Sequence, residues 1–264
     1  MSAPGVTGSS IKAPLVSVIM PAFNAGDTIA RAIDSVLAQT YTCWELWVVD
    51  DASDDATADY VAMKAQGDER INLLRLPHNS GSPARPRNEA IACANGRYLA
   101  FLDADDAWMP RKLDTQLAAM RQADVAISCT GAELVRESGE LMDIRCPPVQ
   151  ATYQGLLAQN TLVCSSVMLD TARLGEYSFP TVGHEDYALW LALARKGHTV
   201  LGIAENLTRY YVRAHSLSAN KFKVLPYFWR IYREREGFSR WRAAYLTARY
   251  AWLARRRALK HARA

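Results

Sequence analysis

Three carboxylates follow an apolar run in the segment Asp103-Ala104-Asp105-Asp106. The preceding residues, Tyr98 to Leu102, have the apolar character of a buried strand. At a strand end, residues separated by one position point to the same side, so Asp103 and Asp105 can act together. Their hard oxygen atoms suit Mg²⁺ or Mn²⁺ held together with substrate phosphates. The alternative is a solvated acidic turn.

A second acidic pair, Asp50-Asp51, follows the apolar run at residues 44–49. In a parallel sheet the two acidic sites share one crevice, where several carboxylates repel one another unless a cation neutralises them. A metal ion and basic side chains would do so. A nearby segment supplies Arg85 and Arg87 at the start of a predicted helix, where guanidinium and backbone N–H groups can hold phosphate oxygens. A capped loop with two exposed arginines is the alternative.

The third acidic site is the pair Glu185-Asp186. Leu189, Trp190 and Leu193 follow at helical spacing, so we expect the pair at the start of a helix whose apolar side faces the core. From there a carboxylate can reach the crevice opposite the other acids. The alternative is that the helix dipole alone favours two acids in a first turn.

The elements that must position these acids alternate between strand and helix. Turn chemistry and apolar runs predict strands at 15–20, 44–49, 71–76 and 98–102, with helices through 29–37, 57–65 and 86–94 between them. This rhythm predicts an α/β fold with a doubly wound, mostly parallel sheet, which binds ligands outside the carboxyl ends of its strands.

Beyond residue 107 the alternation weakens. We expect helices at 112–121 and 185–196 and strands at 125–130 and 163–169, which elaborate the same sheet in α+β fashion. The last 40 or so residues contain a single early proline, Pro226, and one glycine, Gly237, and predict one or two helices.

Composition narrows the class of protein. The chain has 264 residues, of which 50% are hydrophobic and 22% charged, a globular balance that excludes disordered and collagen-like classes. No apolar run is long enough to span a bilayer, and the first residues lack the layout of a secretory signal, so we expect a cytoplasmic protein. Five scattered cysteines without a C-x-x-C pair predict buried free thiols, not a disulfide framework or a zinc ribbon.

Seven short motifs occur in order along the chain: Pro21-Ala-Phe-Asn24, Ser35-Val-Leu-Ala-Gln-Thr40, Trp44-Glu-Leu46, Val49-Asp-Asp-Ala-Ser53, Ala84-Arg-Pro-Arg-Asn88, Gly96-Arg-Tyr-Leu-Ala-Phe-Leu-Asp-Ala-Asp-Asp106 and His184-Glu-Asp-Tyr187. Together they resemble the successive motifs of family 2 glycosyltransferases, from about residue 15 to 196. The resemblance implies a GT-A fold, a nucleotide-sugar donor, a divalent metal ion (Mn²⁺ or Mg²⁺) and inversion at the anomeric carbon.

The resemblance also assigns the nucleotide site. It places Pro21, Ala22 and Phe23 along the base and ribose, with Phe23 able to stack on the base and Asn24 beside them. Asp51 would accept a hydrogen bond from the base, which by the family's habit favours a UDP-sugar.

The remaining donor site follows in the same way. Asp103, with Ala104, would face the ribose or the metal, and Asp105 would bind the metal that bridges the diphosphate. Arg87 would hold phosphate oxygens.

For the acceptor side, the family pattern favours Asp186 over Glu185 as the base that takes the proton from an acceptor hydroxyl. The segment around Arg213 and His215 resembles the one that closes the active site in many of these enzymes, where either side chain would touch the diphosphate or the metal. Val212 separates Tyr211 from Arg213, which departs from the usual pattern and leaves the register open.

The two ends of the chain differ in charge. Residues 221–264 carry 13 Lys and Arg against 2 Glu, or +11, which leaves 18 minus 25, or −7, for residues 1–220. Basic residues interleaved with aromatic ones suit a helix on an anionic membrane, near a lipid-linked acceptor. The segment also resembles the tails of transferases that build bacterial surface polysaccharides. The alternative is a helical cap with a solvated basic face; nucleic acid is not expected.

We therefore predict a polar tail (1–14), a GT-A domain (15–220, with a nucleotide-binding half at 15–107 and an acceptor half at 108–220) and a basic, aromatic helical extension (221–264). The expected activity is inverting transfer of a sugar to a lipid-linked or oligosaccharide acceptor of lipopolysaccharide, capsule or exopolysaccharide, at the inner face of the cytoplasmic membrane. A nucleotidyltransferase and an inactive scaffold are the alternatives, and both a monomer and a homodimer stay open. A dinucleotide oxidoreductase is disfavoured because no G-x-G-x-x-G follows the first strand.

Overall fold

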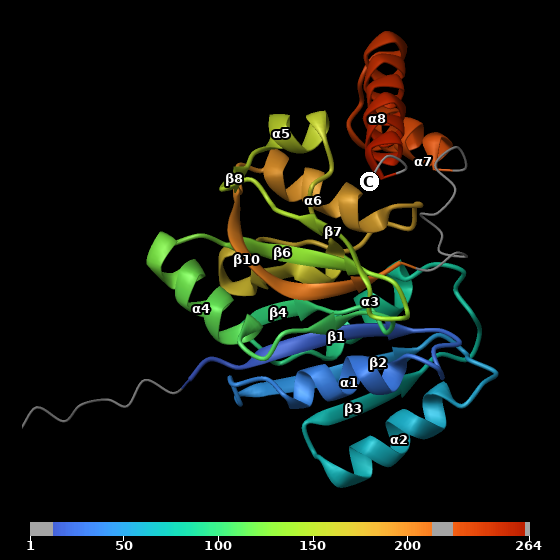
Figure 1. The fold of residues 1–264 in the computed structure, drawn as a ribbon, viewed down its shortest axis with the longest axis vertical. Helices are drawn as coiled ribbons and strands as arrows, with labels where there is room; N and C mark the ends of the chain where they lie inside the picture. Colours follow the sequence, from blue (N-terminus) through green and yellow to red (C-terminus); the bar gives the residue numbers. More distant parts are fainter. Residues whose placement is uncertain (1–12, 213–223, 262–264) are drawn as a thin grey trace, which may run out of the picture.

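The structure is a computed structural model that describes residues 13–212 and 224–261 (Figure 1). Helices lie on both faces of one large mixed sheet. In chain order the elements are β1 (Val16–Ala22), α1 (Ile29–Leu37), β2 (Trp44–Asp50), α2 (Thr57–Gly67), β3 (Ile71–Arg75), α3 (Ala84–Cys93), β4 (Tyr98–Phe101), β5 (Ala107–Trp108), α4 (Lys112–Ala123), β6 (Ile127–Val135), β7 (Leu141–Arg145), β8 (Gln150–Ala151), α5 (Tyr153–Ala158), the 3₁₀ turn η1 (Cys164–Ser166), β9 (Val167–Asp170), the 3₁₀ turn η2 (Thr171–Arg173), α6 (Glu185–Arg195), β10 (Val200–Tyr211), α7 (Leu225–Arg230), the π-helical turn η3 (Ile231–Arg235) and α8 (Arg240–His261).

The first half of the chain forms four parallel strands in the order β3-β2-β1-β4. Val18 of β1 stands between Leu46 of β2 and Ala100 of β4, and all three side chains are fully buried. Strands covered on both faces need such continuous apolar runs, which is why the sequence indicated them clearly. The four predicted strands and the helices between them are confirmed to within about two residues at most ends.

The second half of the chain adds strands of both directions to the sheet. β9 runs antiparallel to both β4 and β6, whereas β10 runs parallel to β6. Because two reversals restore the direction, β6 and β10 point the same way as β1. Among the described residues, the carboxyl ends of β1, β2, β3, β4, β6 and β10 therefore meet at one edge of the sheet, which we call the carboxyl edge.

β10 is a strand of 12 residues that the sequence did not predict. Its register against β6 shifts twice, between Ile203 and Asn206 and between Asn206 and Thr208. Each irregularity interrupts the inward and outward alternation of side chains, so the period of two is lost. The short elements β5, β7, β8 and α5 were also missed.

The core divides into two clusters, one on each face of the sheet. Val18 and Met20 of β1 point to the side covered by α1, α2 and α4, whereas Ile19 points to the side of α3, α5 and α6. The cluster on the side of α3, α5 and α6, which we call the second cluster, includes Trp190 and Phe101, which are among the largest fully buried side chains.

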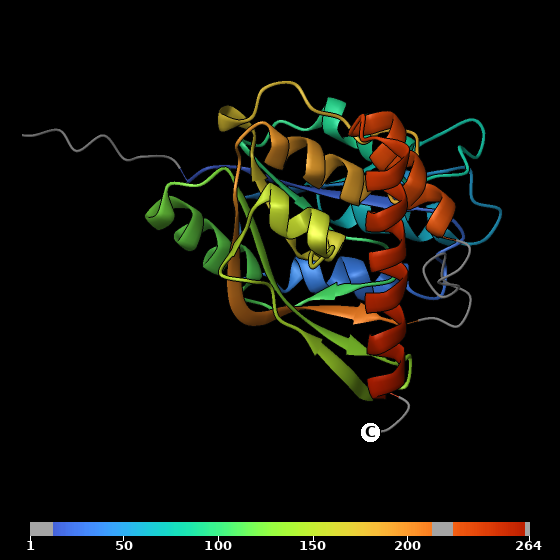
Figure 2. The ribbon, with the colours of Figure 1, turned by 90° about the horizontal axis from the view of Figure 1, so that it is seen from above.

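The C-terminal helices pack on the second cluster through Phe228, Ile231 and Tyr232, all of them buried. Figure 2 shows α8 as a long helix across this side of the molecule. The helical character predicted for this segment is confirmed in its described part. Within the described residues, no helix combines the length and the apolar character needed to cross a bilayer.

All five cysteines are free, as expected. Only Cys129 and Cys164 are buried, however, and Cys146 is exposed in the β7–β8 connection, so the expectation of uniformly buried thiols is wrong.

Candidate active site

The acidic sites predicted from the sequence lie at the carboxyl edge. Phe23 follows β1, Asp51 follows β2 and Asp103 follows β4, and these three strands are neighbours in the sheet. Phe23 is 51% exposed there, unlike the strand residues that precede it. An aromatic ring left in solvent beside several carboxylates is available to a flat ligand group.

Asp51 is buried, and its carboxylate accepts hydrogen bonds from the backbone N and the hydroxyl of Ser80, at 2.9 Å to Oδ1 and 2.8 Å to Oδ2 respectively. The structure thus ties the end of β2 to the loop before α3. Its neighbour Asp50 is fully buried and lies 3.4 Å from Arg75 Nε. The two adjacent acids have different surroundings, and only Asp51 faces the Ser80 loop.

Arg87 is the cation that the crowded carboxylates require. Its Nη2 lies 2.5 Å from Asp103 Oδ1 and its Nη1 lies 2.5 Å from Glu185 Oε1, and its side chain is only 3% exposed. Arg85, two positions earlier, is half exposed and makes a weak pair with Glu89 at 3.7 Å. Arg87 therefore supplies a cation at Asp103 and joins this site to Glu185, whereas Asp50 pairs with Arg75; the holding of phosphate oxygens by Arg87 stays a prediction.

Ser165, a buried residue of η1, holds the turn from Asp103 to Asp106 in place. The Ser165 hydroxyl accepts a hydrogen bond from the Asp103 backbone N at 3.1 Å and donates one to Asp106 Oδ2 at 2.5 Å. Trp108 Nε1 in turn donates to the Ser165 carbonyl at 2.7 Å. Sequence reasoning missed Ser165 because a serine in an apolar run has no distinctive spacing.

Asp106 belongs to this support and not to the open crevice. It is fully buried, and the Tyr211 backbone N donates to its Oδ1 at 3.1 Å. Burial, with smaller contributions from Asp105 and Asp103, raises the pKa of Asp106 well above its usual value. Asp103 and Asp105 are half-buried and remain the carboxylates that can meet a ligand.

Arg31 of α1 is a second residue that sequence reasoning missed. Its Nη2 donates to the Asp105 carbonyl at 2.8 Å, its Nη1 pairs with Glu137 at 3.0 Å, and its guanidinium lies 3.4 Å from the centre of the Tyr211 ring. A single side chain thus connects the acidic turn to the β6–β7 turn and to the end of β10. A lone arginine on an amphipathic helix gives no sequence signal for such a role.

Glu185 and Asp186 lie in the first turn of α6, as predicted, but their surroundings differ. Glu185 is buried and paired with Arg87; burial raises the pKa of Glu185 and the guanidinium offsets part of that effect. Asp186 is half-buried, and its carboxylate has no hydrogen bond or ion pair among the residues that the structure describes. Of the two carboxylates, only that of Glu185 is held by a described cation.

The other predicted residues fall into three groups. Pro21 and Ala22 end β1, whereas Asn24 adopts a φ of 47° and braces the neighbouring loop, accepting from Asp54 N at 3.1 Å. Ala104 is buried within the acidic turn. Arg213 and His215 lie outside the described residues.

The acidic residues of the carboxyl edge bear on whether the site can hold a divalent ion. In the described ranges no group of three or more His, Cys, Asp and Glu side chains is arranged to do so. Asp103 and Asp105 supply hard oxygen atoms at one place, which fits Mg²⁺ or Mn²⁺ when phosphate oxygens complete the coordination. These residues therefore fit an ion that arrives with a diphosphate.

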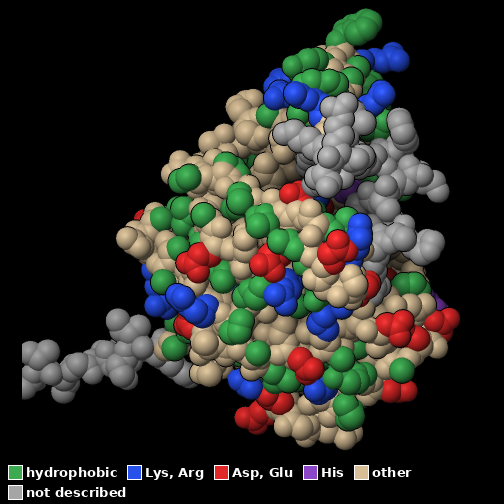
Figure 3. All heavy atoms as spheres, in the orientation of Figure 1, with side chains coloured by type: hydrophobic (Ala, Val, Ile, Leu, Met, Phe, Trp, Pro, Cys, Tyr) green, Lys and Arg blue, Asp and Glu red, His purple; other side chains and the backbone are tan. Residues whose placement is uncertain are grey.

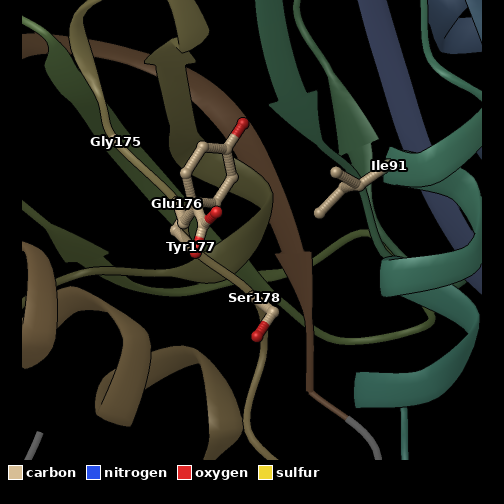
Figure 4. A pocket seen from close by; sticks show the side chains of 5 residues that line it. All are labelled: Ile91, Gly175, Glu176, Tyr177 and Ser178. Carbon is tan, nitrogen blue, oxygen red and sulfur yellow. The ribbon is translucent and has the colours of Figure 1, made fainter.

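A shallow pocket of about 650 Å³ lies elsewhere, lined by Ile91, Gly175, Glu176, Tyr177 and Ser178 (Figure 4). Ile91 is near the end of α3 and the other residues follow η2, which places the pocket toward the opposite edge of the sheet. The pocket is separate from the acidic residues of the carboxyl edge.

The fold and the acidic edge define a class of protein, and comparisons agree with it. A truncated chain of TarS from S. aureus, solved with UDP-GlcNAc, superposes with a TM-score of 0.68 at 20% identity, covering 89% of this chain and 71% of that one. A mannosyltransferase from Pyrobaculum calidifontis, solved with GDP-Man and Mn²⁺, gives 0.66 at 20% identity, covering 91% and 70%. The molecule has the GT-A fold of these transferases.

Sequence comparison gives the family. The profile described as "Glycosyl transferase family 2" matches residues 17–165. A putative teichuronic acid biosynthesis glycosyltransferase of Bacillus subtilis, TuaG, is 39% identical over 240 residues, which are 90% of this chain and 95% of the relative. The β-1,3-glucosyltransferase WfgD of Escherichia coli is 38% identical over 216 residues, which are 81% and 84%. The chain belongs to glycosyl transferase family 2 and is a glycosyltransferase.

Proposed function

We propose that this enzyme transfers a sugar from a UDP-sugar, with inversion, to a hydroxyl of a lipid-linked acceptor in the assembly of a bacterial surface polysaccharide. The observation that carries the proposal is the arrangement at the carboxyl edge. Asp103 and Glu185 are joined through Arg87, whereas Asp186 in the same turn is left without a partner among the described residues. One site thus contains Asp103 for the sugar donor and Asp186 as the base.

The donor side is built by the ends of β1, β2 and β4. The exposed Phe23 ring offers a stacking surface for a nucleobase, and Asp51, held by Ser80, offers a carboxylate beside it. The name of WfgD specifies UDP-Glc, and the S. aureus TarS chain was solved with UDP-GlcNAc, which supports uridine as the base.

Asp103 and Asp105 would hold a divalent ion together with the two phosphates, and when bound that ion supplies positive charge to the departing nucleoside diphosphate. Asp103 also pairs with Arg87, so the guanidinium keeps one carboxylate oxygen in place. The P. calidifontis mannosyltransferase was solved with Mn²⁺, which supports an ion of this kind. The proposal predicts metal-dependent binding of the nucleotide.

Asp186 acts as the base. Its carboxylate takes the proton from an acceptor hydroxyl while that oxygen bonds to the anomeric carbon and the bond from this carbon to the diphosphate oxygen breaks. Attack from the side opposite the leaving group inverts the anomeric configuration. Glu185 cannot replace Asp186, because it is buried against Arg87.

The acceptor would be reached at a membrane surface. On α8, Trp241, Tyr245 and Trp252 recur at helical spacing and are 87%, 63% and 55% exposed, whereas Ala243 and Leu246 on the opposite side are buried. Helix α8 contains several arginines and no acid, and Figure 3 shows hydrophobic and basic side chains side by side at the top of the view.

An exposed aromatic stripe flanked by positive charge suits a helix that lies in an anionic bilayer surface. The name of WfgD gives a diphosphoundecaprenol acceptor, which supports a substrate in the membrane. We therefore place the working enzyme at the cytoplasmic face of the membrane, bound through the extension at 221–264.

The test is transfer from UDP-glucose to a GlcNAc-diphosphate lipid, with the anomeric configuration of the product assigned by NMR. We expect a β-linked product, a kcat lowered about 10²- to 10⁴-fold in Asp186→Asn, and loss of metal-dependent donor binding in Asp105→Asn. Asp59→Asn, an exposed acid on α2, is the control and should match the wild type. Full activity of the folded Asp186→Asn protein would exclude Asp186 as the base.

A further inference from the structure

Gly183 lies directly before the segment His184-Glu185-Asp186, which we call the acid motif, and it contacts the C-terminal helix α7. A Cβ atom placed on Gly183 would lie 2.4 Å from Cδ1 and 2.5 Å from Cγ of Tyr227, which belongs to α7. Real Cβ atoms do not approach carbon so closely, so the Tyr227 ring occupies the space that a side chain at position 183 would need. Tyr227 therefore packs directly on the backbone that leads into Glu185 and Asp186.

The next residue, His184, is held by the same helix. Its ring lies 5.0 Å from the ring of Phe228 and 6.2 Å from that of Tyr227. Phe228 in turn stacks on Tyr250 of α8, with ring centres 3.7 Å apart. The contacts thus run from α8 through α7 to the residue that precedes the two acids.

His184 has a backbone that needs such support. It caps α6 with a φ of 59° and a ψ of 47°, the left-handed region, which residues other than glycine uncommonly adopt, although histidine does so more often than most. Backbone conformations of this kind persist only where the surroundings enforce them. The rings of Tyr227 and Phe228 are those surroundings.

The other side of the motif is tied to the same segment. Tyr187, one residue after Asp186, lies 5.3 Å from the Phe228 ring, and its hydroxyl is 3.1 Å from that of Tyr232. Asp186 itself has no hydrogen bond in the described part of the chain that would orient its carboxylate. Its position is set by the backbone on either side, at 184 and at 187.

We propose that Tyr227 and Phe228 are positioning residues for Asp186, so that the C-terminal helices complete the active site in addition to contacting a membrane. This inference rests on the proposed role of Asp186 as the base. It assigns to a segment beyond the matched family region, residues 17–165, a part in the chemical step.

The test uses the full-length enzyme and a detergent-solubilised acceptor, so that membrane binding does not limit the rate. Tyr227 is 40% exposed, which makes its truncation compatible with folding. We expect Tyr227→Ala to lower kcat about tenfold while leaving the donor KM and the UDP affinity unchanged, since a small displacement of a reacting group is costly to the rate. Tyr227→Phe keeps the ring and should restore the wild-type kcat.

A double-mutant cycle adds a second measurement. In Gly183→Ala the new methyl group and the Tyr227 ring cannot both keep their places, so kcat should fall at least as far as in Tyr227→Ala. In Gly183→Ala/Tyr227→Ala the space is free, so kcat should equal that of Tyr227→Ala within about twofold, a non-additive result. Met63→Ala, an exposed apolar side chain on α2, is the control.

The inference is overturned if Tyr227→Ala keeps the wild-type kcat. It is also overturned if Gly183→Ala lowers kcat by the same factor in the wild type and in Tyr227→Ala. Failure of the proposed function has a different signature, because the wild-type enzyme would then transfer no sugar and UDP with metal would not raise its melting temperature.

Discussion

Arg87 Nη1 lies 2.5 Å from Glu185 Oε1 across 98 positions of sequence, and Nη2 of the same guanidinium lies 2.5 Å from Asp103 Oδ1. Helix α3, which carries Arg87, thereby holds Glu185 at the start of α6. The pair is nearly removed from water, since the exposed fractions of the Arg87 and Glu185 side chains are 3% and 10%. Buried pairs of this kind are costly to break from one side.

Arg87→Met should therefore destabilise the protein strongly. Removing the guanidinium leaves two carboxylates close together without a cation, and we expect the free energy of unfolding to fall by about 3–5 kcal/mol in urea titrations. Arg85→Met on the same helix is the matched control, and its half-exposed, weakly paired side chain should change stability by less than about 0.5 kcal/mol. Equal effects of the two substitutions would contradict the structure.

Ser165→Ala should weaken ligand binding, because Ser165 supports the turn that carries Asp103 and Asp105. The substitution removes the acceptor for Asp103 N and the donor to Asp106, and we expect a loss of about 1–3 kcal/mol in stability and a weaker affinity for UDP with metal, measured by calorimetry. Ser166→Ala is the comparison, because that hydroxyl donates to the Val163 carbonyl and contacts no acid of the turn among the described residues. It should leave the nucleotide affinity intact; a loss as large as that of Ser165→Ala would show that the effect is not specific to the turn.

Lys112 predicts a pH dependence of stability. Burial lowers the pKa of this fully buried amine from 10.5 to about 7, and its Nζ contacts Gln116 Oε1 at 2.6 Å. Between these two values the unfolded chain binds the proton that the folded protein does not, so stability rises with pH.

From pH 7 to pH 9 the free energy of unfolding of the wild type should increase by about 2 kcal/mol more than that of Lys112→Met. Urea titrations at both pH values measure this difference. Parallel pH dependence of the two proteins would mean that Lys112 stays charged when buried.

Helix α8 predicts binding to anionic vesicles. Trp241→Ala/Trp252→Ala should reduce co-sedimentation with vesicles of phosphatidylglycerol and phosphatidylethanolamine about tenfold, because it removes two exposed indoles from one side of the helix. High salt should weaken binding of the wild type as well. If the double variant binds as the wild type does, α8 is a cap on the domain and the membrane proposal fails.

The sequence predicted the first half of the fold in some detail. The run 98–101 is apolar at every position, and the run 16–20 is apolar except at Ser17, because both faces of these strands are covered, so strand and helix alternate visibly along the chain. The same alternation predicted a parallel sheet, in which Asp51 and Asp103 lie at the carboxyl edge. The crowding of carboxylates also predicted basic side chains near them, and the structure places Arg87 against Asp103.

The second half gave weaker signals for physical reasons. β10 contains two register shifts, and β9 is reversed between β4 and β6, a topology that no local pattern encodes. Ser165 and Arg31 support the acidic turn through contacts with residues 62 and 74 positions away. Such partners are set by tertiary packing, and a single sequence carries no periodicity that reports them.

The most direct test of the donor site is the melting temperature of the purified protein with UDP, GDP and dTDP, each with and without Mn²⁺ or Mg²⁺. A ligand at 100 times its dissociation constant stabilises by about 2.7 kcal/mol, which is readily visible as a shift. We predict a rise with UDP that requires metal, that is lost in Asp105→Asn and that persists in Asp186→Asn. No shift with any of the three nucleotides would contradict the assignment of the carboxyl edge as the donor site.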